Sequence, residues 1–206
     1  IRLHKPEDFG KMRKAGQLTA QLLDILVEAA KPGVTTATLN RITVEFAHDN
    51  NAIPATIGYR GYKYALCTSI NHVVCHGMPN DKPLLDGDIL NIDVTLIVDG
   101  WYGDTSRMVN VGNVSRAAER LVQVTYECLM RGIAVVKPGA HLGDVGHAIQ
   151  SHAEAHRCTV VRDFFHVADL ARLCTLAAED EGSGTFNAGS GVGTSLNDLV
   201  TRIGDG

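Results

Sequence analysis

The sequence predicts an α/β protein of the α+β kind, in which an antiparallel sheet is backed by helices. One observation is a repeat: a helix-like segment, the tripeptide Lys-Pro-Gly, a second helix-like segment and strand-like residues occur twice in this order, around residues 31–33 and 137–139. The other is a hairpin pattern around Asp99-Gly100, where strand-forming residues flank a turn dipeptide. With 206 residues, of which 45% are hydrophobic and 20% charged, the chain can bury the core of one or two domains.

The first copy of the repeat begins with two predicted helices. Residues 6–30 open with a proline and two acidic residues, which favour a helix start, and Lys-Pro-Gly ends the segment. Residues 35–50 place Leu39, Ile42 and Phe46 at the spacing of one helical face. We expect both helices to cover the sheet that follows.

Residues 52–110 are strand-like, and their last part predicts a hairpin whose register can be counted. If Asp99 and Gly100 form a two-residue loop, the facing pairs are Val98–Trp101, Thr95–Asp104 and Asp93–Ser106. Asp93 and Asp104 then lie diagonally on one sheet face, about 7–8 Å apart, where two carboxylates repel unless a cation lies between them. The alternative is a pair of solvent-facing aspartates on an open sheet face.

The second copy of the repeat follows directly. Residues 115–136 and 142–156 predict a further helix pair around the second Lys-Pro-Gly, and residues 158–163 predict the next strand. A chance similarity of two helix pairs is the alternative, because Lys-Pro-Gly is a common helix stop.

The repeat then breaks, so its second half is incomplete. Residues 165–178 are weakly helix-like, and residues 179–206 are rich in Gly, Ser, Asn and Thr. The GSGVG stretch there lacks the glycine spacing and the preceding strand of a phosphate-binding loop. The sequence therefore predicts a domain over residues 1–163 and a divergent, flexible tail over residues 164–206.

Composition argues against several functional classes. The net charge of −4, without a basic block, argues against nucleic-acid binding. No apolar run approaches a membrane span, and no secretory signal is present. The cysteines are odd in number and form no CxxC pair, which argues against a disulfide framework or structural zinc and favours a cytoplasmic location. They are Cys67, Cys75, Cys128, Cys158 and Cys174.

Four residues in the strand region suggest a binding site. His76, in VVCHGMP, follows an apolar pair and precedes a glycine, so its imidazole is expected at a turn, where it could donate to a carbonyl or a developing oxyanion. A capped surface histidine is the alternative. Tyr59, Tyr62 and Cys67 precede it and could line an apolar pocket or simply pack in the core.

The remaining histidines give weaker signals. His152 and His156 are spaced to share a helix face, but Glu154 points away from them and no third ligand is apparent. We therefore expect a surface helix there. His141 and His147 are likewise expected in solvent.

The segments VVCHGMP, NIDVT and GDTSRM, together with the opening KPEDFGKMRKAG, resemble type I methionine aminopeptidases over residues 1–163. The resemblance implies the pita-bread fold and metal-dependent removal of the initiator methionine from nascent polypeptides by a cytoplasmic, monomeric enzyme. It also implies contact with nascent N-termini and with the ribosome, without binding to nucleic acid or membrane. HGMP argues against the proline-directed members of the same fold.

The resemblance assigns roles to the residues singled out above. Asp93 and Asp104 match the aspartates that bind two divalent ions, either cobalt, manganese, iron or zinc, which activate a water for attack on the peptide bond. His76 matches the catalytic histidine that contacts the substrate near the scissile bond. The methionine side-chain pocket maps to Tyr59, Tyr62 and Cys67.

The match ends after the VVRD segment. There the family has a Gly-His-Gly ligand and two later glutamate ligands, whereas His166 stands one position early between phenylalanine and valine. Glu179 and Glu181 match neither glutamate. We therefore expect weakened metal binding. A catalytically inactive relative, truncated or frameshifted and lacking half of the metal ligands, is the alternative function.

Overall fold

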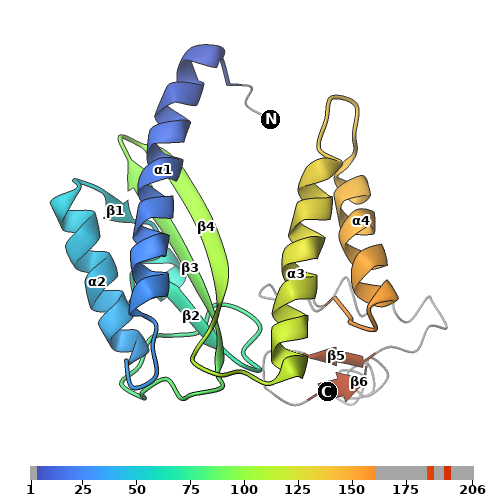
Figure 1. Cartoon of the computed structure of the whole chain (residues 1–206). Helices are drawn as coiled ribbons and strands as arrows, with labels where there is room; N and C mark the ends of the chain where they lie inside the picture. The colour runs from blue at the N-terminus through green and yellow to red at the C-terminus, as the bar shows by residue number, and fades with distance from the viewer. Residues whose placement is uncertain (1–3, 161–184, 188–192, 196–206) are drawn as a thin grey trace, which may run out of the picture. The chain divides into compact units, whose positions relative to one another are not determined.

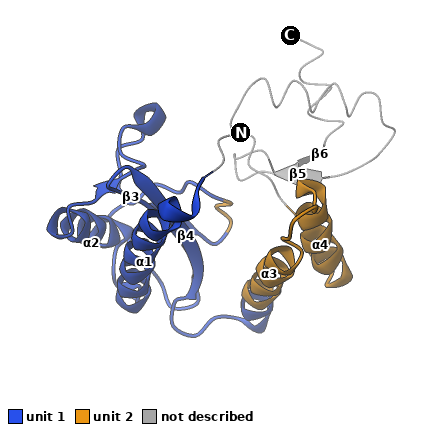
Figure 2. Cartoon of the chain, turned by 90° about the horizontal axis from the view of Figure 1, so that it is seen from above, with its two compact units in different colours: residues 1–71, 75–120 blue, residues 72–74, 121–206 orange. Residues whose placement is uncertain are grey.

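The structure is a computed structural model. It describes residues 4–160, 185–187 and 193–195. The chain divides into two compact units, which are treated separately here: Ile1–Asn71 with Cys75–Arg120, and His72–Val74 with Leu121–Gly206 (Figure 2). Among the described helices, none has both the length and the apolar character needed to cross a membrane.

The first unit consists of two helices and an antiparallel sheet (Figure 1). Its elements are α1 (Pro6–Ala29), α2 (Thr36–Asp49), β1 (Ile53–Pro54), a 3-10 turn η1 (Tyr59–Gly61), β2 (Cys67–Ile70), β3 (Ile89–Val98) and β4 (Trp101–Asn110). The central strand is β3, which pairs with β1 and β2 along one edge and with β4 along the other. The predicted class of a sheet backed by helices is confirmed.

The predicted hairpin is also confirmed. Asp99 and Gly100 both have positive φ, 51° and 81°, as a two-residue turn that matches strand twist requires. The facing pairs are those counted from the sequence: Val98–Trp101, Thr95–Asp104 and Asp93–Ser106. Asp93 and Asp104 therefore lie on one face of the sheet.

The two faces of β3 have different surroundings. The even-numbered residues of β3 are buried in the core with leucines of α1 and α2: Leu90, Ile92, Val94, Leu96 and Val98 against Leu22, Leu23, Leu26 and Leu39. The odd-numbered residues between Asn91 and Ile97 are only half-buried. The aspartates thus lie on the face opposite the one that the helices cover.

Two glycines of the family-like segments allow close backbone contacts. A Cβ on Gly103 would lie 2.4 Å from the backbone oxygen of Ala15 in α1, and a Cβ on Gly77 would lie 2.1 Å from the backbone oxygen of Thr68 in β2. Only glycine fits at either place without moving the backbone. These glycines therefore fix α1 against β4 and the His76 loop against β2.

The second unit contains a helix pair, α3 (Arg116–Ala134) and α4 (Leu142–Ala155), and a short antiparallel pair, β5 (Thr185–Asn187) and β6 (Gly193–Ser195). The first residues of α3, up to Arg120, belong to the first unit. Val124 and Cys128 of α3 form a small core with Ala153 of α4.

The two Lys-Pro-Gly segments form the same turn. Val34 donates its backbone N–H to Lys31 O at 3.0 Å, and Ala140 donates to Lys137 O at the same distance. The glycine of each turn has positive φ, 88° and 85°. In both copies the next helix begins five residues after the lysine, which supports the predicted duplication.

The second copy departs from the prediction after its helices. Residues 158–160 have no regular secondary structure, so the strand predicted at 158–163 is wrong for that part. Cys158 N instead donates to Ala153 O at 2.9 Å and closes the end of α4. The rest of that strand, and the tail predicted at 164–206 apart from β5 and β6, lie outside the described residues.

Candidate functional site

On the open face of the sheet, Asp93 of β3 lies between β2 and β4. Its Cα pairs with Cys67 of β2 on one side and Ser106 of β4 on the other. Asp104 lies diagonally across, and its carboxylate accepts a hydrogen bond of 3.0 Å from the hydroxyl of Thr95. The pleat alternation of all three strands turns these side chains to the same side.

The electrostatics of this face favour a bound cation. Burial raises the pKa of Asp93 above its ordinary value, and the neighbouring charge of Asp104 raises it further, while His76 lowers it. A proton or a metal ion would relieve the repulsion between the two carboxylates. Carboxylate oxygens are also the ligands that divalent ions such as manganese accept.

His76 is held in an unusual backbone conformation beside this pair. Its φ is 54°, in the left-handed region that residues other than glycine seldom adopt. The next residue, Gly77, donates its N–H to Ser69 Oγ at 3.1 Å, and its oxygen accepts from Thr68 N at 2.8 Å. The imidazole is therefore presented from a loop fixed to β2.

Tyr62 and Cys67 adjoin the aspartates, whereas Tyr59 makes no hydrogen bond or ion pair with them. The Tyr62 hydroxyl lies 3.1 Å from Gly77 O and 3.0 Å from Leu66 O, so it joins the His76 loop to β2. Burial raises the pKa of both the Tyr62 hydroxyl and the Cys67 thiol, which keeps them neutral. The side chain of Tyr59 is 66% exposed, under the guanidinium of Arg60.

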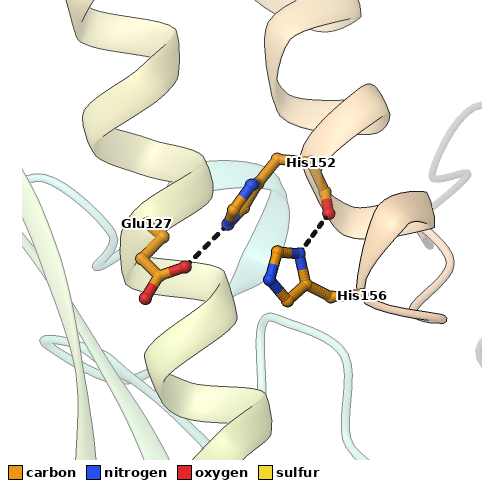
Figure 3. A group of neighbouring side chains, drawn as sticks. All are labelled: Glu127, His152 and His156. Atoms are coloured by element: carbon orange, nitrogen blue, oxygen red, sulfur yellow. Dashed lines mark hydrogen bonds and ion pairs between the residues drawn. The ribbon is translucent and has the colours of Figure 1, made fainter.

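A second cluster was missed by the sequence interpretation. His152 is only 8% exposed and not in solvent, and Glu127 of α3 approaches it, so the expected surface helix is wrong for His152. Glu127, His152 and His156 form a group of metal-ligating side chains (Figure 3). Glu127 follows the buried Val124 by three residues, which is the signal that places it toward α4.

The two other histidines of this region behave as expected. His141 and His147 are exposed in the structure. His141 is the residue before α4, where its backbone N–H donates to Asp144 at 2.8 Å, and His147 lies on the outer side of the same helix.

Comparison with known proteins shows the family of the chain. Metallopeptidase family M24 matches residues 10–203. A methionine aminopeptidase of Rickettsia prowazekii (strain Madrid E) is 58% identical over 164 residues, covering 80% of this chain and 63% of that protein. The chain thus spans less than two thirds of the length of this curated relative.

Solved structures agree with this placement. The crystal structure of methionine aminopeptidase from Rickettsia prowazekii superposes with a TM-score of 0.78 at 58% identity, covering 80% of this chain and 66% of the other. The prolidase from Pyrococcus furiosus gives a TM-score of 0.66 at 15% identity over 75% of this chain and 44% of its own, which shows a shared fold alone. The fold predicted from the sequence is confirmed, and the chain belongs to metallopeptidase family M24.

Proposed function

We propose that this chain contains the two-aspartate part of a methionine aminopeptidase metal centre, with the N-terminal methionine of a polypeptide as its substrate. The observation that favours this most is the juxtaposition of Asp93 and Asp104 on the open sheet face, with the raised pKa of Asp93. A half-buried carboxylate whose ionised form is disfavoured, with a second carboxylate diagonally across, suits a divalent cation.

The metal ligands would be Asp93 and Asp104. Divalent ions held there would supply Lewis-acid chemistry and would activate a water toward a peptide carbonyl. The hydroxyl of Thr95 donates to Asp104 and orients that carboxylate. The carboxylate would therefore lose less conformational entropy when it binds a metal ion.

His76 would act on the substrate peptide. The Gly77 contacts hold its imidazole at the open face, near enough to Asp93 to influence the carboxyl's pKa. From there it can donate a hydrogen bond to the carbonyl oxygen of the scissile peptide as negative charge develops.

The methionine pocket would be formed around Tyr62 and Cys67, with Tyr59 at its rim. Tyr62 and Cys67 remain neutral because burial raises the pKa of each, so this wall offers an apolar surface with a polarisable sulfur. A thioether side chain suits such a wall better than a charged one does.

A weakly metal-binding, slow or inactive relative is the second candidate. It is favoured by the sequence after residue 163, where no Gly-His-Gly segment follows and His166 stands one position early. Two aspartates are fewer protein ligands than catalytic sites usually have. We therefore expect this chain to bind metal less tightly than its longer relatives.

The test is release of methionine from a Met-Ala-Ser peptide with added cobalt or manganese. Asp93→Ala serves as the blank. Asp49→Ala serves as the matched control, since Asp49 is an exposed helix carboxylate whose ion-pair partner is the neighbouring His48. We expect manganese binding that depends on Asp93 and little free methionine. Rapid metal-dependent turnover that is lost in the Asp93→Ala variant would show full activity and contradict the second candidate. Manganese binding that is unchanged in that variant would exclude the hairpin as the metal site.

A further inference from the structure

The side chains of Glu127, His152 and His156 converge between α3 and α4 of the second unit. The two histidine rings are 4.2 Å apart between centroids, and His152 Nε2 is 2.7 Å from Glu127 Oε2. One ligand atom from each residue lies within 4.8 Å of both others. Figure 3 shows the two imidazoles and the carboxylate directed toward one small region.

The ring of His156 is oriented as in a metal-binding histidine. Its Nδ1 lies 2.9 Å from the backbone oxygen of His152, one turn earlier. A carbonyl oxygen only accepts hydrogen bonds, so Nδ1 is the donor, and in the neutral ring Nε2 is the nitrogen with the lone pair. Histidines that bind metals are commonly fixed by this ring N–H to carbonyl bond.

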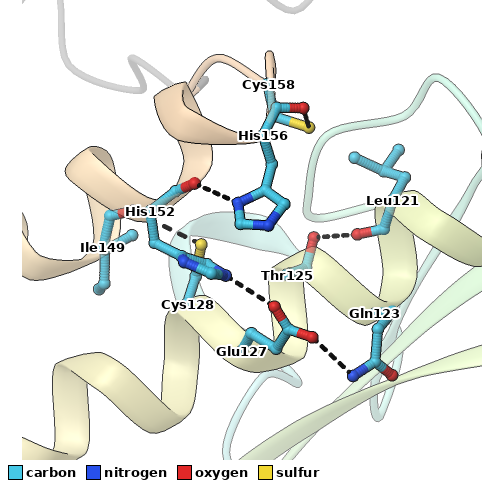
Figure 4. A network of polar contacts seen from close by, with 9 residues as sticks. All are labelled: Leu121, Gln123, Thr125, Glu127, Cys128, Ile149, His152, His156 and Cys158. Atoms are coloured by element: carbon cyan, nitrogen blue, oxygen red, sulfur yellow. Dashed lines mark hydrogen bonds and ion pairs between the residues drawn. The ribbon is translucent and has the colours of Figure 1, made fainter.

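Glu127 is ionised and held at both oxygens. Hydrogen bonds from Gln123 and His152, together with the charges of the two histidines, lower the pKa of its carboxyl below the ordinary value. Gln123 Nε2 donates to Oε1 at 2.9 Å, and His152 lies at Oε2 (Figure 4). The cluster therefore presents one fixed negative charge next to two imidazoles.

We propose that Glu127, His152 and His156 bind a divalent transition ion of the zinc class. Two nitrogens and one carboxylate oxygen form a donor set for zinc, copper or nickel, whereas calcium and magnesium require more oxygens. Three protein ligands leave a fourth tetrahedral position for water. This site uses neither aspartate of the β3–β4 hairpin and does not depend on the proposed function.

The adjustment needed for an ion is small. Zinc lies about 2.0–2.2 Å from nitrogen and oxygen ligands, so tetrahedral ligand atoms lie roughly 3.3–3.6 Å from one another. The 2.7 Å contact between His152 and Glu127 must open slightly, and the widest pair, within 4.8 Å, must close. Rotations of the side chains of Glu127 and His156, both partly exposed, are sufficient for this.

The neighbouring thiol of Cys128 is directed elsewhere. Its Sγ donates to Ile149 O of α4 at 3.5 Å, and burial raises its pKa, so it stays protonated. A protonated thiol is a poor metal ligand. The donor set is therefore imidazole and carboxylate.

A structural ion pair between Glu127 and His152 is the competing explanation. Such a pair needs only two residues, and His156 would contribute nothing to metal affinity. The two explanations differ in what the removal of His156 does.

The experiment is a zinc titration of the full, untagged chain in an Asp93→Ala/Asp104→Ala background, measured by calorimetry. A parallel titration with cobalt is measured by the absorption of the bound ion. We expect one tightly bound ion per chain. His156→Ala and Glu127→Gln should each weaken binding by more than about tenfold, since the loss of a ligand exceeds the loss of an outer partner. His147→Ala, which removes an exposed imidazole from α4, should leave the affinity unchanged.

Two results would overturn the proposal: no stoichiometric binding in this background, or affinity that His156→Ala leaves intact. Because His152 is buried, its replacement could disturb the helix pair, so the decisive variants are at His156 and Glu127. Helix content by circular dichroism checks that they fold, and His156→Gln supplies a second variant if His156→Ala does not.

Discussion

The open face of the β3–β4 hairpin and the α3–α4 helix pair each gather ligand-type side chains, but their electrostatics are opposite. On the hairpin, the like charge of Asp104 adds to burial in raising the pKa of Asp93. On the helix pair, hydrogen bonds and positive neighbours lower the pKa of Glu127. A cation would therefore reduce the repulsion between the two aspartates of the hairpin. The carboxylate of Glu127 already has partners of opposite charge or hydrogen-bond donors without a cation.

The two regions also differ in rigidity. The hairpin is locked by backbone contact at Gly103, where a Cβ would meet Ala15 O of α1. In the helix pair, the nearest atoms to a Cβ on Gly132 would be side-chain atoms of α4: Ile149 Cδ1 at 3.1 Å, Ile149 Cγ1 at 3.2 Å and Val145 Cγ1 at 3.4 Å. A carboxylate pair on a rigid sheet keeps its geometry, and a helix cluster can adjust to an ion.

The largest expected effect tests that rigidity. Gly103→Ala forces α1 away from β4, so we expect a loss of about 1–3 kcal/mol in the free energy of unfolding, as for other overpacked sites. Gly132→Ala should change it by less than about 1 kcal/mol, because Ile149 can rotate and alanine favours the helix. Chemical denaturation of both variants gives the comparison, and equal losses would contradict it.

The next effect is the stabilisation of the helix pair by zinc. At a free concentration of about 10 times the dissociation constant, binding should add about 1.4 kcal/mol to the folded state. Hydrogen exchange of α3 and α4 amides should slow accordingly in the Asp93→Ala/Asp104→Ala background, and β3 amides should not. Protection restricted to β3 would reverse the assignment of the two regions.

The smallest effect is electrostatic. Without metal at neutral pH, Asp93→Asn should stabilise the first unit by about 0.2–1 kcal/mol, the size of a cross-strand pair, because it removes a charge that burial disfavours and that the repulsion of Asp104 disfavours further. The pKa of Asp93 is higher in the folded state than in the unfolded state. Its protonation therefore stabilises the folded state in full below the unfolded pKa of about 3.9, and this contribution is lost as the pH rises through the folded pKa.

The gain from Asp93→Asn should therefore shrink toward pH 4 and below. Melting temperatures in chelator across this range measure it. A gain that does not depend on pH would show that the charge of Asp93 is not its cause.

The sequence predicted the hairpin well because two local rules fix it. Side chains alternate along a strand, and Asp99-Gly100 sets the turn, so the pairing of Asp93 and Asp104 followed by counting. The helix bounds followed from proline, acidic and Lys-Pro-Gly signals, which act within one turn of the chain.

The remaining features depend on contacts that local rules do not contain. Glu127 meets His152 only because α3 packs on α4, and no spacing within one helix gives that pairing. Residues 158–160 form no strand because a strand needs a paired neighbour, and Cys158 bonds to the end of α4 instead. Tyr59 is exposed next to Arg60, whose left-handed backbone conformation has no sequence signal.

The most direct measurement is a crossed metal titration of two single variants, with manganese as the oxygen-preferring ion and zinc as the nitrogen-accepting ion. We expect Asp93→Ala to weaken manganese binding and to spare the tight zinc phase. We expect His156→Ala to do the reverse. A single variant that abolishes the binding of both ions, or two variants that leave both unchanged, would contradict the existence of two metal sites of different chemistry in this chain.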